Sequence, residues 1–412
     1  MSQGVLEALT QIARARGVRY DYVIESLKEA ISTGTKKKLG KDTEVEVLVN
    51  KASGEVRISV VKKVVEEVTN ESLEVTLDEA RKAKPGAQVG DDFRILILLE
   101  DLGRGIIDTI KQSLVHKVRE AEKDRLYEEY QKRVGELAKG IIKVVGRNEI
   151  VVDLGPVEAS IPSFGIVRNE YYRLDGPIKA IVLRVEKSTF GPRIILSRTD
   201  PAFLSKLLTI EIPEIRDGLI EVVRVVRAAG VRAKVAVASK DASIDPVGAC
   251  IGFRGTRIQS VVKELGKERI DVIQWSDDPM VLIERGLSPA RVKEVIRIDD
   301  RTVKAIIPDE DYSKAIGKGG VNVDLVSELA GVHIDLKKES EFEIEKKEAE
   351  LAKIAIKDLE SIDDGLKQQL IDRGYTSVLS LVKATAEELV FLLGKSEEEV
   401  KELIEKAANA KA

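Results

Sequence analysis

Two short glycine turns hold the residues best suited to chemistry, and the chemistry that they suit is the binding of a phosphate. The first turn is Gly252-Phe253-Arg254-Gly255, with Arg257 close behind it. Because glycine has no Cβ, a sugar-phosphate chain can approach the peptide backbone closely. A helix that begins directly after the turn would offer free amide groups and the positive end of its dipole to that phosphate. Arg254 and Arg257 would add positive charge at the same place.

The same arrangement occurs again at Gly317-Lys318-Gly319-Gly320. A chain with 30 glycines contains about two such spacings by chance, so the flanking segments must carry the inference. Each turn lies between two segments with helical spacing of apolar residues, and a strand-like segment follows, at 270–273 and at 332–336. Helix, glycine turn, helix and strand, found twice, indicate an internal repeat. This is the pattern of the KH domain, whose turn clamps about four nucleotides of a single strand; the alternative is two unrelated helical hairpins.

Residues suited to catalysis or metal binding are scarce. His116, His333 and Cys250 are the only histidines and the only cysteine, too few for a zinc site or a nucleophile with its base. The carboxylate pairs Asp277-Asp278 and Asp299-Asp300 stand at strand ends, where turn residues are expected. The chain has no P-loop or dinucleotide-binding fingerprint. We therefore expect no metal, no cofactor and no enzyme activity, including no nuclease, nucleotidase or phosphorolytic activity.

Composition predicts a soluble chain of several domains. The chain has 412 residues, of which 43% are hydrophobic, enough for several small cores. It has neither an apolar run of transmembrane length nor a signal-peptide stretch, and its single cysteine suits a reducing compartment. We expect a cytoplasmic monomer without membrane contact. The net charge of −4 predicts local phosphate contacts, because 201–270 hold 12 basic against 8 acidic residues while 337–412 hold 13 against 18.

The N-terminal domain, residues 1–136, is predicted to be α+β. Its expected helices and strands follow the apolar periodicity: helices at 5–16 and 20–33, strands at 43–49, 56–60 and 93–98. Residues 34–41 (GTKKKLGK) predict a basic loop, either a solvated turn or a contact with a polymer. A helix of about 30 residues, 105–137, would be about 45 Å long and would space two domains.

Residues 137–200 predict a small five-stranded OB-like barrel, with glycine and proline at its turns. The expected strands are 140–145, 149–154, 157–161, 178–185 and 193–197. The aromatic residues near its loops could stack bases or belong to the core: Phe164, Tyr171, Tyr172 and Phe190. Arg198, at the exit of the last strand, could face a phosphate or cap the barrel.

The two repeats, residues 201–277 and 278–345, are predicted to share an α-β-β-α-α-β order. In the first, a helix at 201–210 and strands at 220–226 and 232–238 precede the glycine turn. In the second, a helix is expected at 289–295 and strands at 295–298 and 302–307. Only residues around 277–279 separate the repeats, so we expect them to pack as one rigid platform.

The C-terminal part, residues 346–412, predicts a small all-α domain similar to a helix-hairpin-helix fold, with helices broken at Gly374 and Gly394. The charged stretch 337–350 before it predicts a solvated linker or helix. Because this tail is acidic, we expect it to be dispensable for binding RNA and polymerase, to be tethered, and to act as a regulatory or partner-docking domain. The whole chain is thus a predicted multidomain α+β protein.

Two segments, Leu196–Leu204 (LSRTDPAFL) and Asp245–Gln259 (DPVGACIGFRGTRIQ), resemble signature segments of the NusA family of bacterial transcription elongation, termination and antitermination factors. The resemblance covers residues 1–345 well and the tail less well. It implies an N-terminal domain that docks on RNA polymerase, then an S1 barrel and two KH domains that receive the nascent single-stranded RNA, with other elongation or antitermination factors as further partners.

Carried onto this sequence, the resemblance implies the following RNA-contacting residues: Arg198, Gly252, Phe253, Arg254, Gly255, Arg257, Gly317, Lys318, Gly319, Gly320 and Asn322. One departure concerns the tail. Some members of the family end in two acidic helical repeats that contact the polymerase α subunit or mask the RNA-binding face, whereas this chain has room for one.

Two other classes of protein share such modules. A relative of polyribonucleotide phosphorylase would carry large catalytic domains first and then KH before S1, the reverse of the order here. A general RNA-binding protein of translation or ribosome assembly would have the same modules without affinity for polymerase. Binding of polymerase by residues 1–135 discriminates this second class from a transcription factor.

Overall fold

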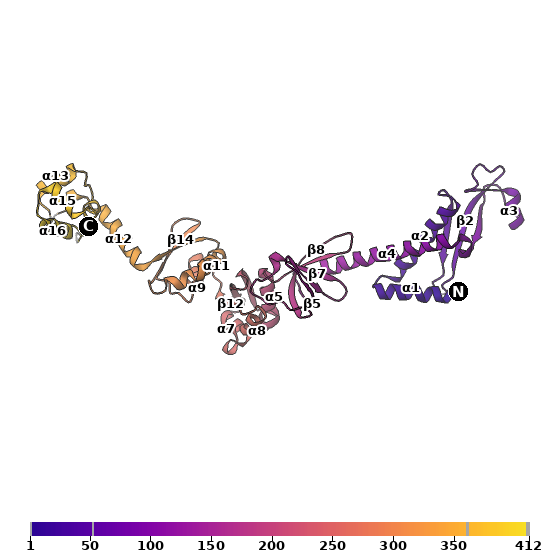
Figure 1. The fold of residues 1–412 in the computed structure, drawn as a ribbon, viewed down its shortest axis with the longest axis horizontal. Coiled ribbons are helices and arrows are strands. Elements are labelled where there is room, and N and C mark those ends of the chain that lie inside the picture. The colour runs from indigo at the N-terminus through magenta and orange to yellow at the C-terminus, as the bar shows by residue number, and fades with distance from the viewer. Residues whose placement is uncertain (1, 52, 360–361, 409–412) are drawn as a thin grey trace. The chain divides into compact units, whose positions relative to one another are not determined.

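The computed structural model describes residues 2–51, 53–359 and 362–408, and its chain is multidomain α+β, as predicted (Figure 1). It divides into two compact units, the first comprising 1–166 and 172–198 and the second 167–171 and 199–412. No helix in the described part of the chain is both long and apolar enough to span a bilayer.

The first unit begins with two helices and a four-stranded sheet. Strands β1 and β4 pair antiparallel with β2, and β3 pairs parallel with its end. The elements are α1 (Ser2–Arg16), α2 (Tyr20–Leu39), β1 (Glu44–Val49), β2 (Val56–Val65), β3 (Glu74–Thr76), α3 (Leu77–Ala83) and β4 (Asp92–Ile97). The predicted α+β domain is confirmed, while β3 and α3 were not expected from the sequence.

The basic stretch predicted as a loop at 34–41 is mostly helix, because α2 continues to Leu39. Gly34 lies where α2 meets a later helix, and a Cβ on it would lie 2.7 Å from Cγ1 of Ile110. The glycine therefore permits close packing of two helices and does not break α2. The helix ends at Gly40, whose φ is 124°. Three consecutive lysines, 36–38, occupy the last turn of α2, where positive charge complements the helix dipole.

Helix α4 (Arg104–Gln131) belongs to two hydrophobic cores. Ile110, Leu114 and Val118 pack in the core of the N-terminal domain. Leu126 and Tyr130 pack in the core of the barrel that follows. The helix ends at Gln131, six residues before the predicted end at 137, because residue 137 already pairs with β8 of the barrel.

The predicted five-stranded barrel is confirmed. Its strands close in the order β5-β6-β7-β9-β8 around a core of aliphatic side chains. They are β5 (Leu137–Val145), β6 (Glu149–Asp153), β7 (Glu158–Pro162), β8 (Pro177–Glu186) and β9 (Arg193–Ser197). Of the aromatic residues near its loops, Tyr172 packs against the core, whereas Phe164, Tyr171 and Phe190 are exposed.

The second unit begins with the two predicted repeats, and both have the expected α-β-β-α-α-β order. In each, the first two strands pair antiparallel and the third pairs parallel with the second, so that the third strand is an edge. The first repeat consists of α5 (Pro201–Glu211), α6 (Pro213–Arg216), β10 (Ile220–Ala228), β11 (Arg232–Ser239), α7 (Pro246–Ile251), α8 (Thr256–Glu264) and β12 (Arg269–Gln274). The second consists of α9 (Pro279–Gly286), β13 (Glu294–Arg297), β14 (Thr302–Ile307), α10 (Tyr312–Ile316), α11 (Val321–Ala330) and β15 (His333–Lys338).

The helix predicted at 289–295 is wrong, because the first helix of the second repeat, α9, lies ten residues earlier. Asp278 caps α9 by accepting a hydrogen bond from the backbone N–H of Met280, and Pro279 occupies the first turn. Leu282 and Ile283 bury its apolar face. The segment interpreted as the linker between the repeats is therefore the start of a helix.

The two repeats pack on each other through a shared hydrophobic cluster. Its buried members come from the first sheet and from α9 and α11: Val226, Ala236, Ile273, Leu282, Leu325 and Leu329, with Trp275 at its margin. Arg224 crosses the junction and donates from Nη1 to the carbonyl of Leu329 at 2.7 Å. The expected platform of two packed repeats is confirmed.

The charged stretch after the second repeat forms α12 (Glu339–Lys353), and the expectation of a tether is wrong. The first half of α12 is ion-paired to the second sheet: Glu339 pairs with Lys293, and Glu345 pairs with Lys304 and Lys337. Ser340 also donates from its hydroxyl to Asp309 at 2.7 Å. Charge attraction between an acidic helix and a basic sheet face therefore holds the start of the tail against the second repeat.

The remainder of the tail is all-helical, as predicted, around its own hydrophobic core. Its helices are α13 (Asp364–Asp372), α14 (Val378–Val382), α15 (Ala386–Leu393) and α16 (Glu397–Ala408). The predicted breaks are confirmed at Gly374 and Gly394, which have φ values of 92° and 62°.

This arrangement predicts that the second repeat needs α12. In β14, the side chains that face the core of the repeat are those of Val303, Ala305 and Ile307. Because side chains alternate along a strand, Ile306 points to the opposite face of the sheet, and yet it is only 1% exposed. A chain ending at residue 338 would uncover that face, and we expect its second repeat to melt about 5 °C or more below that of a chain ending at 353. Differential scanning calorimetry of residues 1–338 and 1–353 tests this. Equal melting of the two would show that α12 adds nothing to the repeat.

Candidate nucleic-acid interface

The two glycine turns have the same backbone conformation. Gly252 and Gly317 have φ/ψ of 73°/175° and 75°/173°, and Gly255 and Gly320 have φ of 77° and 83°. At each of these four positions φ is positive, which strongly favours glycine. The repeat seen in the sequence is therefore also a repeat of structure.

The two middle residues of each turn project away from the fold. Phe253 is 79% exposed, and the Arg254 guanidinium lies 5.2 Å from the centre of its ring. Arg254 has a left-handed φ of 51°, where the second turn has a glycine, Gly319, with φ of 65°. Lys318 is also exposed. Neither Arg254 nor Lys318 has an ion-pair partner among the residues that the structure describes, so both charges are available to a ligand.

Each turn leads directly into a helix, α8 or α11, whose first amide groups have no side-chain cap. The N-cap residues are Gly255 and Gly320, which have no side chain to accept a hydrogen bond. The first amides of a helix have no partner within the helix and carry partial positive charge. The turns can therefore offer backbone donors to a phosphate, as the sequence predicted.

Arg257 and Asn322 occupy equivalent positions, five residues after the first glycine of each turn, and both point inward. Arg257 donates from Nη1 to the carbonyl of Ala249 at 2.7 Å and pairs with Glu214 at 2.9 Å. Asn322 is 1% exposed and donates from Nδ2 to the carbonyl of Ala315 at 3.0 Å. Each side chain thus ties the helix after the turn to the helix before it.

The same two side chains also set the close packing of the turns. A Cβ on Gly252 would lie 2.7 Å from Cγ of Arg257, and a Cβ on Gly317 would lie 2.7 Å from Cβ of Asn322. Direct RNA contact by Arg257 and Asn322 stays a prediction. The geometry assigns them a positioning role, which the sequence analysis missed.

Arg198 is 95% buried at the end of β9 and donates from Nη1 to the carbonyl of Lys179 at 2.6 Å. Of the two alternatives open from the sequence, this geometry favours a cap on the barrel. Its contact with a phosphate stays a prediction.

Three of the four carboxylates in the pairs serve as turn or cap residues. Asp278 caps α9, Asp277 accepts a hydrogen bond from Nε1 of Trp275 at 3.0 Å, and Asp299 accepts one from the backbone N–H of Arg301 at 2.7 Å. Cys250 is buried in α7, and this burial raises the pKa of its thiol to about 11. Cys250 is therefore a neutral packing residue at neutral pH and not a nucleophile.

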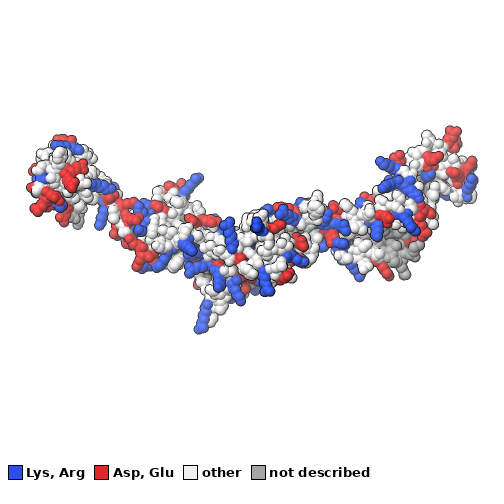
Figure 2. Space-filling view, in the orientation of Figure 1, with Lys and Arg blue, Asp and Glu red and all other residues white. Residues whose placement is uncertain are grey.

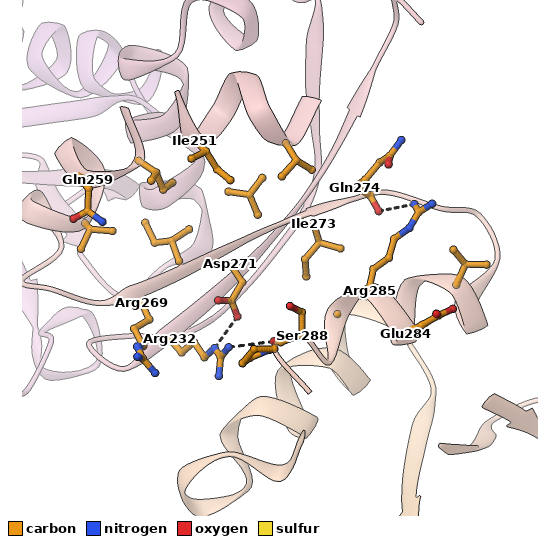
Figure 3. Close-up of a pocket in the computed structure, with 18 of the residues that line it drawn as sticks. Arg232, Ile251, Gln259, Arg269, Asp271, Ile273, Gln274, Glu284, Arg285 and Ser288 are labelled. Carbon is orange, nitrogen blue, oxygen red and sulfur yellow. Dashed lines mark hydrogen bonds and ion pairs between the residues drawn. The ribbon is translucent and has the colours of Figure 1, made fainter. Parts of the chain in front are cut away.

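Beside the first turn lies a groove of about 1120 Å³ that the sequence analysis did not foresee. It follows the edge strand β12, as Figure 3 shows: Ile251 and Gln259 come from α7 and α8 on one side, and Glu284 and Arg285 come from α9 on the other. Its apolar lining includes Val247, Ile251, Ile258, Val262, Ile270, Val272, Ile273, Val281 and Pro289. An apolar floor suits the faces of bases, and the backbone groups of an unpaired edge strand suit their hydrogen-bonding edges.

The groove is lined by more basic than acidic side chains: Arg232, Lys267, Arg269 and Arg285 against Asp271 and Glu284. Arg232 is paired with Asp271 at 2.7 Å, but Lys267, Arg269 and Arg285 have no ion-pair partner in the described part of the chain. Lys and Arg side chains gather over the lower edge of the first repeat, around α7 and α8, in Figure 2. Asp and Glu side chains gather instead along α12. The surface that carries the first turn therefore suits a polyanion better than the surface of α12 does.

The positioning role of Asn322 predicts an effect on stability. Asn322→Ala removes the donor to the carbonyls of Lys314 and Ala315, and we expect a loss of about 1–2 kcal/mol for the second repeat, with faster amide hydrogen exchange around Gly317. Asn148→Ala, at an exposed position in the barrel, is the matched control. Unchanged exchange at the turn in Asn322→Ala would contradict the role.

Comparison with known proteins agrees with this organisation. Residues 4–124 match the model of the NusA N-terminal domain, 198–275 that of the NusA-like first KH domain, and 279–344 that of the NusA-like second KH domain. The chain thus carries the three domain types in the order of the structural units above.

Full-length relatives extend the match. The transcription termination/antitermination protein NusA of Halalkalibacterium halodurans is 40% identical over 342 residues, covering 83% of this chain and 90% of the relative. That of Rickettsia conorii is 32% identical over 410 residues, covering 98% and 82%. A solved N-terminal domain of NusA from Bacillus subtilis is 34% identical and covers 30% of this chain and 98% of its own, with a TM-score of 0.25. On the sequence identity and coverage of these relatives, the chain belongs to the NusA family.

Proposed function

We propose that the chain is an RNA-binding transcription factor that associates with RNA polymerase and the nascent transcript and modulates pausing, elongation, termination and antitermination. The observation that carries this proposal is the pair of glycine turns with the same conformation on one packed platform. The names of the relatives, transcription termination/antitermination protein NusA, supply the biological setting.

The proposed RNA contacts are of two kinds. At the turns, the backbone amides and the exposed Arg254 and Lys318 would hold phosphates, and Phe253 would stack on a base. In the groove, the edge strand β12 and its apolar surroundings would hold bases. Arg257 and Asn322 would act by shaping the turns.

The remaining parts of the proposal concern partners and class. The N-terminal domain would bind polymerase, other elongation or antitermination factors would join it, and the protein would act in the cytoplasm as a monomer. It would be no enzyme, because the acidic residues singled out in the sequence cap helices and turns and the single thiol is buried and neutral. A general RNA-binding protein of translation would lack the affinity for polymerase.

The RNA role is tested at the turns. Two double variants place carboxylates where a phosphate would lie: Phe253→Asp with Arg254→Asp, and Lys318→Asp with Gly319→Asp. Positions 254 and 319 have a left-handed backbone, which Asp tolerates. We expect each pair to weaken binding of single-stranded RNA about tenfold at 0.1 M salt, and the quadruple variant to weaken it further because both turns hold one strand. Fluorescence anisotropy with a labelled RNA measures this. Phe391→Asp in α15 with Lys395→Asp in the loop that follows it is a control of the same chemistry. Unchanged affinity in the quadruple variant with a native circular dichroism spectrum would sink the RNA assignment.

The polymerase role is tested by deletion of the N-terminal domain. Because Leu126 and Tyr130 of α4 belong to the core of the barrel, the shortened chain should begin at residue 119 and not after 135. We expect the full chain to co-purify with core RNA polymerase and residues 119–412 to lose most of this association while they still bind RNA. A shortened chain that retains both would place the polymerase contact elsewhere, and a full chain without affinity for polymerase would favour the role in translation.

A further inference from the structure

Helix α12 is joined directly to the second repeat and to the C-terminal helices. Strand β15 ends at Lys338, and α12 begins at the next residue, Glu339. At the other end, Ile354 directly follows α12 and is buried in the core of the C-terminal helices, and its carbonyl accepts a hydrogen bond from the backbone N–H of Val378 at 2.9 Å. The 15 residues of α12 include neither glycine nor proline. The helix is therefore an unbroken rod, and the place where the C-terminal helices can pivot on the second repeat is its start.

Charged contacts hold the first half of α12 on the second repeat. Two carboxylates of the helix, Glu339 and Glu345, pair with three lysines of the repeat, Lys293, Lys304 and Lys337. The hydrogen bond between Lys337 and Glu345 raises the pKa of the ammonium and holds the pKa of the carboxyl below its usual value. A hydrogen bond to Glu339 likewise raises the pKa of Lys293. The contact therefore depends on side chains that are ionised at neutral pH.

The helix itself adds little apolar burial to this contact. Among residues 339–353, all of which the structure describes, none is buried. Phe342 lies between the two carboxylates at helical spacing and is half-buried, with the Lys304 ammonium 6.0 Å from the centre of its ring. Ion pairs between partly exposed side chains each stabilise a contact only weakly, and salt screens them. The loss of a few charges is therefore enough to release the first half of α12.

The second half of α12 belongs to the C-terminal helices. Leu351 packs against their hydrophobic core, in which Ile354 and Ile356 are buried. Glu348 also pairs with Lys383, at the end of α14, at 2.8 Å. Apolar burial thus fastens α12 to the C-terminal helices, whereas charges fasten it to the second repeat. Because salt screens charges and does not remove apolar burial, salt acts first on the contact with the second repeat.

We propose that α12 is an electrostatic latch between the second repeat and the C-terminal helices. While its ion pairs are formed, the latch is closed and the C-terminal helices move together with the second repeat. When the charges are screened or removed, α12 pivots at Lys338 and swings away as one rigid piece with the C-terminal helices, while each domain stays folded. The latch thus sets how far the C-terminal helices can reach. It involves no RNA, so it stands or fails separately from the proposed function.

The test follows the rotation of a dye on the C-terminal helices of the full chain. The dye is attached through Glu405→Cys, at an exposed position of α16. Cys250, the single cysteine of the chain, is buried and does not compete for the dye. Time-resolved fluorescence anisotropy measures the rotational correlation time. We expect it to be long at about 0.1 M salt and to fall about threefold at about 1 M, where charges are screened beyond about 3 Å.

Three variants of the dye-labelled chain separate the latch from other effects. Glu345→Lys places a third ammonium beside Lys304 and Lys337, and it should shorten the correlation time about threefold already at about 0.1 M salt. Glu350→Lys makes the same change of charge at an exposed position in the other half of α12, and it should have no effect. Lys337→Glu combined with Glu345→Lys restores opposite charges across the contact, and it should recover about half or more of the lost correlation time. Circular dichroism checks that α12 stays helical.

Each outcome decides the proposal. Faster rotation in Glu345→Lys, recovery with Lys337→Glu and no effect of Glu350→Lys support the latch. Equal rotation with and without Glu345→Lys overturns it, whether the dye rotates slowly or rapidly in both, as does a correlation time that salt does not change. Loss of helical circular dichroism in Glu345→Lys, or no recovery with Lys337→Glu, also overturns it, because Glu345 would then stabilise the helix itself and not its contact with the second repeat.

Discussion

The second unit depends on the burial of one face of the first repeat's sheet beneath α9 and α11. Apolar side chains from both repeats provide the driving force, and Lys234 lies among them fully buried. Burial lowers the pKa of its ammonium, while Asp271 at 2.9 Å opposes this shift. Removing one partner of such a pair leaves an uncompensated polar group in the interior, which is costly. The same ammonium donates to the carbonyl of Gly286 in α9 at 2.7 Å, so this buried cation also links the first repeat to the second.

The repeats use one plan with different residues. Arg257 and Asn322 fill equivalent positions, and each bonds to carbonyls at the end of the preceding helix, although one is a large cation and the other a small amide. Arg254 and Gly319 likewise share a left-handed backbone. The conformation of the turn is kept while its charge differs, so the two turns can present different surfaces to one strand.

Neighbouring domains along the chain share elements. Helix α4 contributes side chains to the cores of the N-terminal domain and of the barrel, α9 flanks the groove of the preceding repeat, and the start of α12 lies on the sheet of the second. The boundary drawn from the sequence at 136 therefore does not separate the two cores, because Leu126 and Tyr130 lie before it and pack in the barrel. An element that serves two cores couples the stability of both.

The sequence by itself determined the order of domains, the barrel, both glycine turns and nearly every strand, because these follow from local apolar periodicity and from backbone conformations that favour glycine. It failed at Gly34 and at 289–295, and it did not foresee the positioning role of Arg257 and Asn322. The sequence predicts the start of a loop at Gly34, but a glycine can also allow two helices to pack closely. It predicts the start of a helix at Pro289, whereas the helix starts at Pro279 after its cap Asp278. It predicts an exposed Arg257, because the sequence does not show which carbonyl accepts the hydrogen bond of this side chain. Only the tertiary structure decided where the groove lies, because its walls come from segments that no local pattern brings together: α7 and α8, the edge of β12, and α9 of the next repeat.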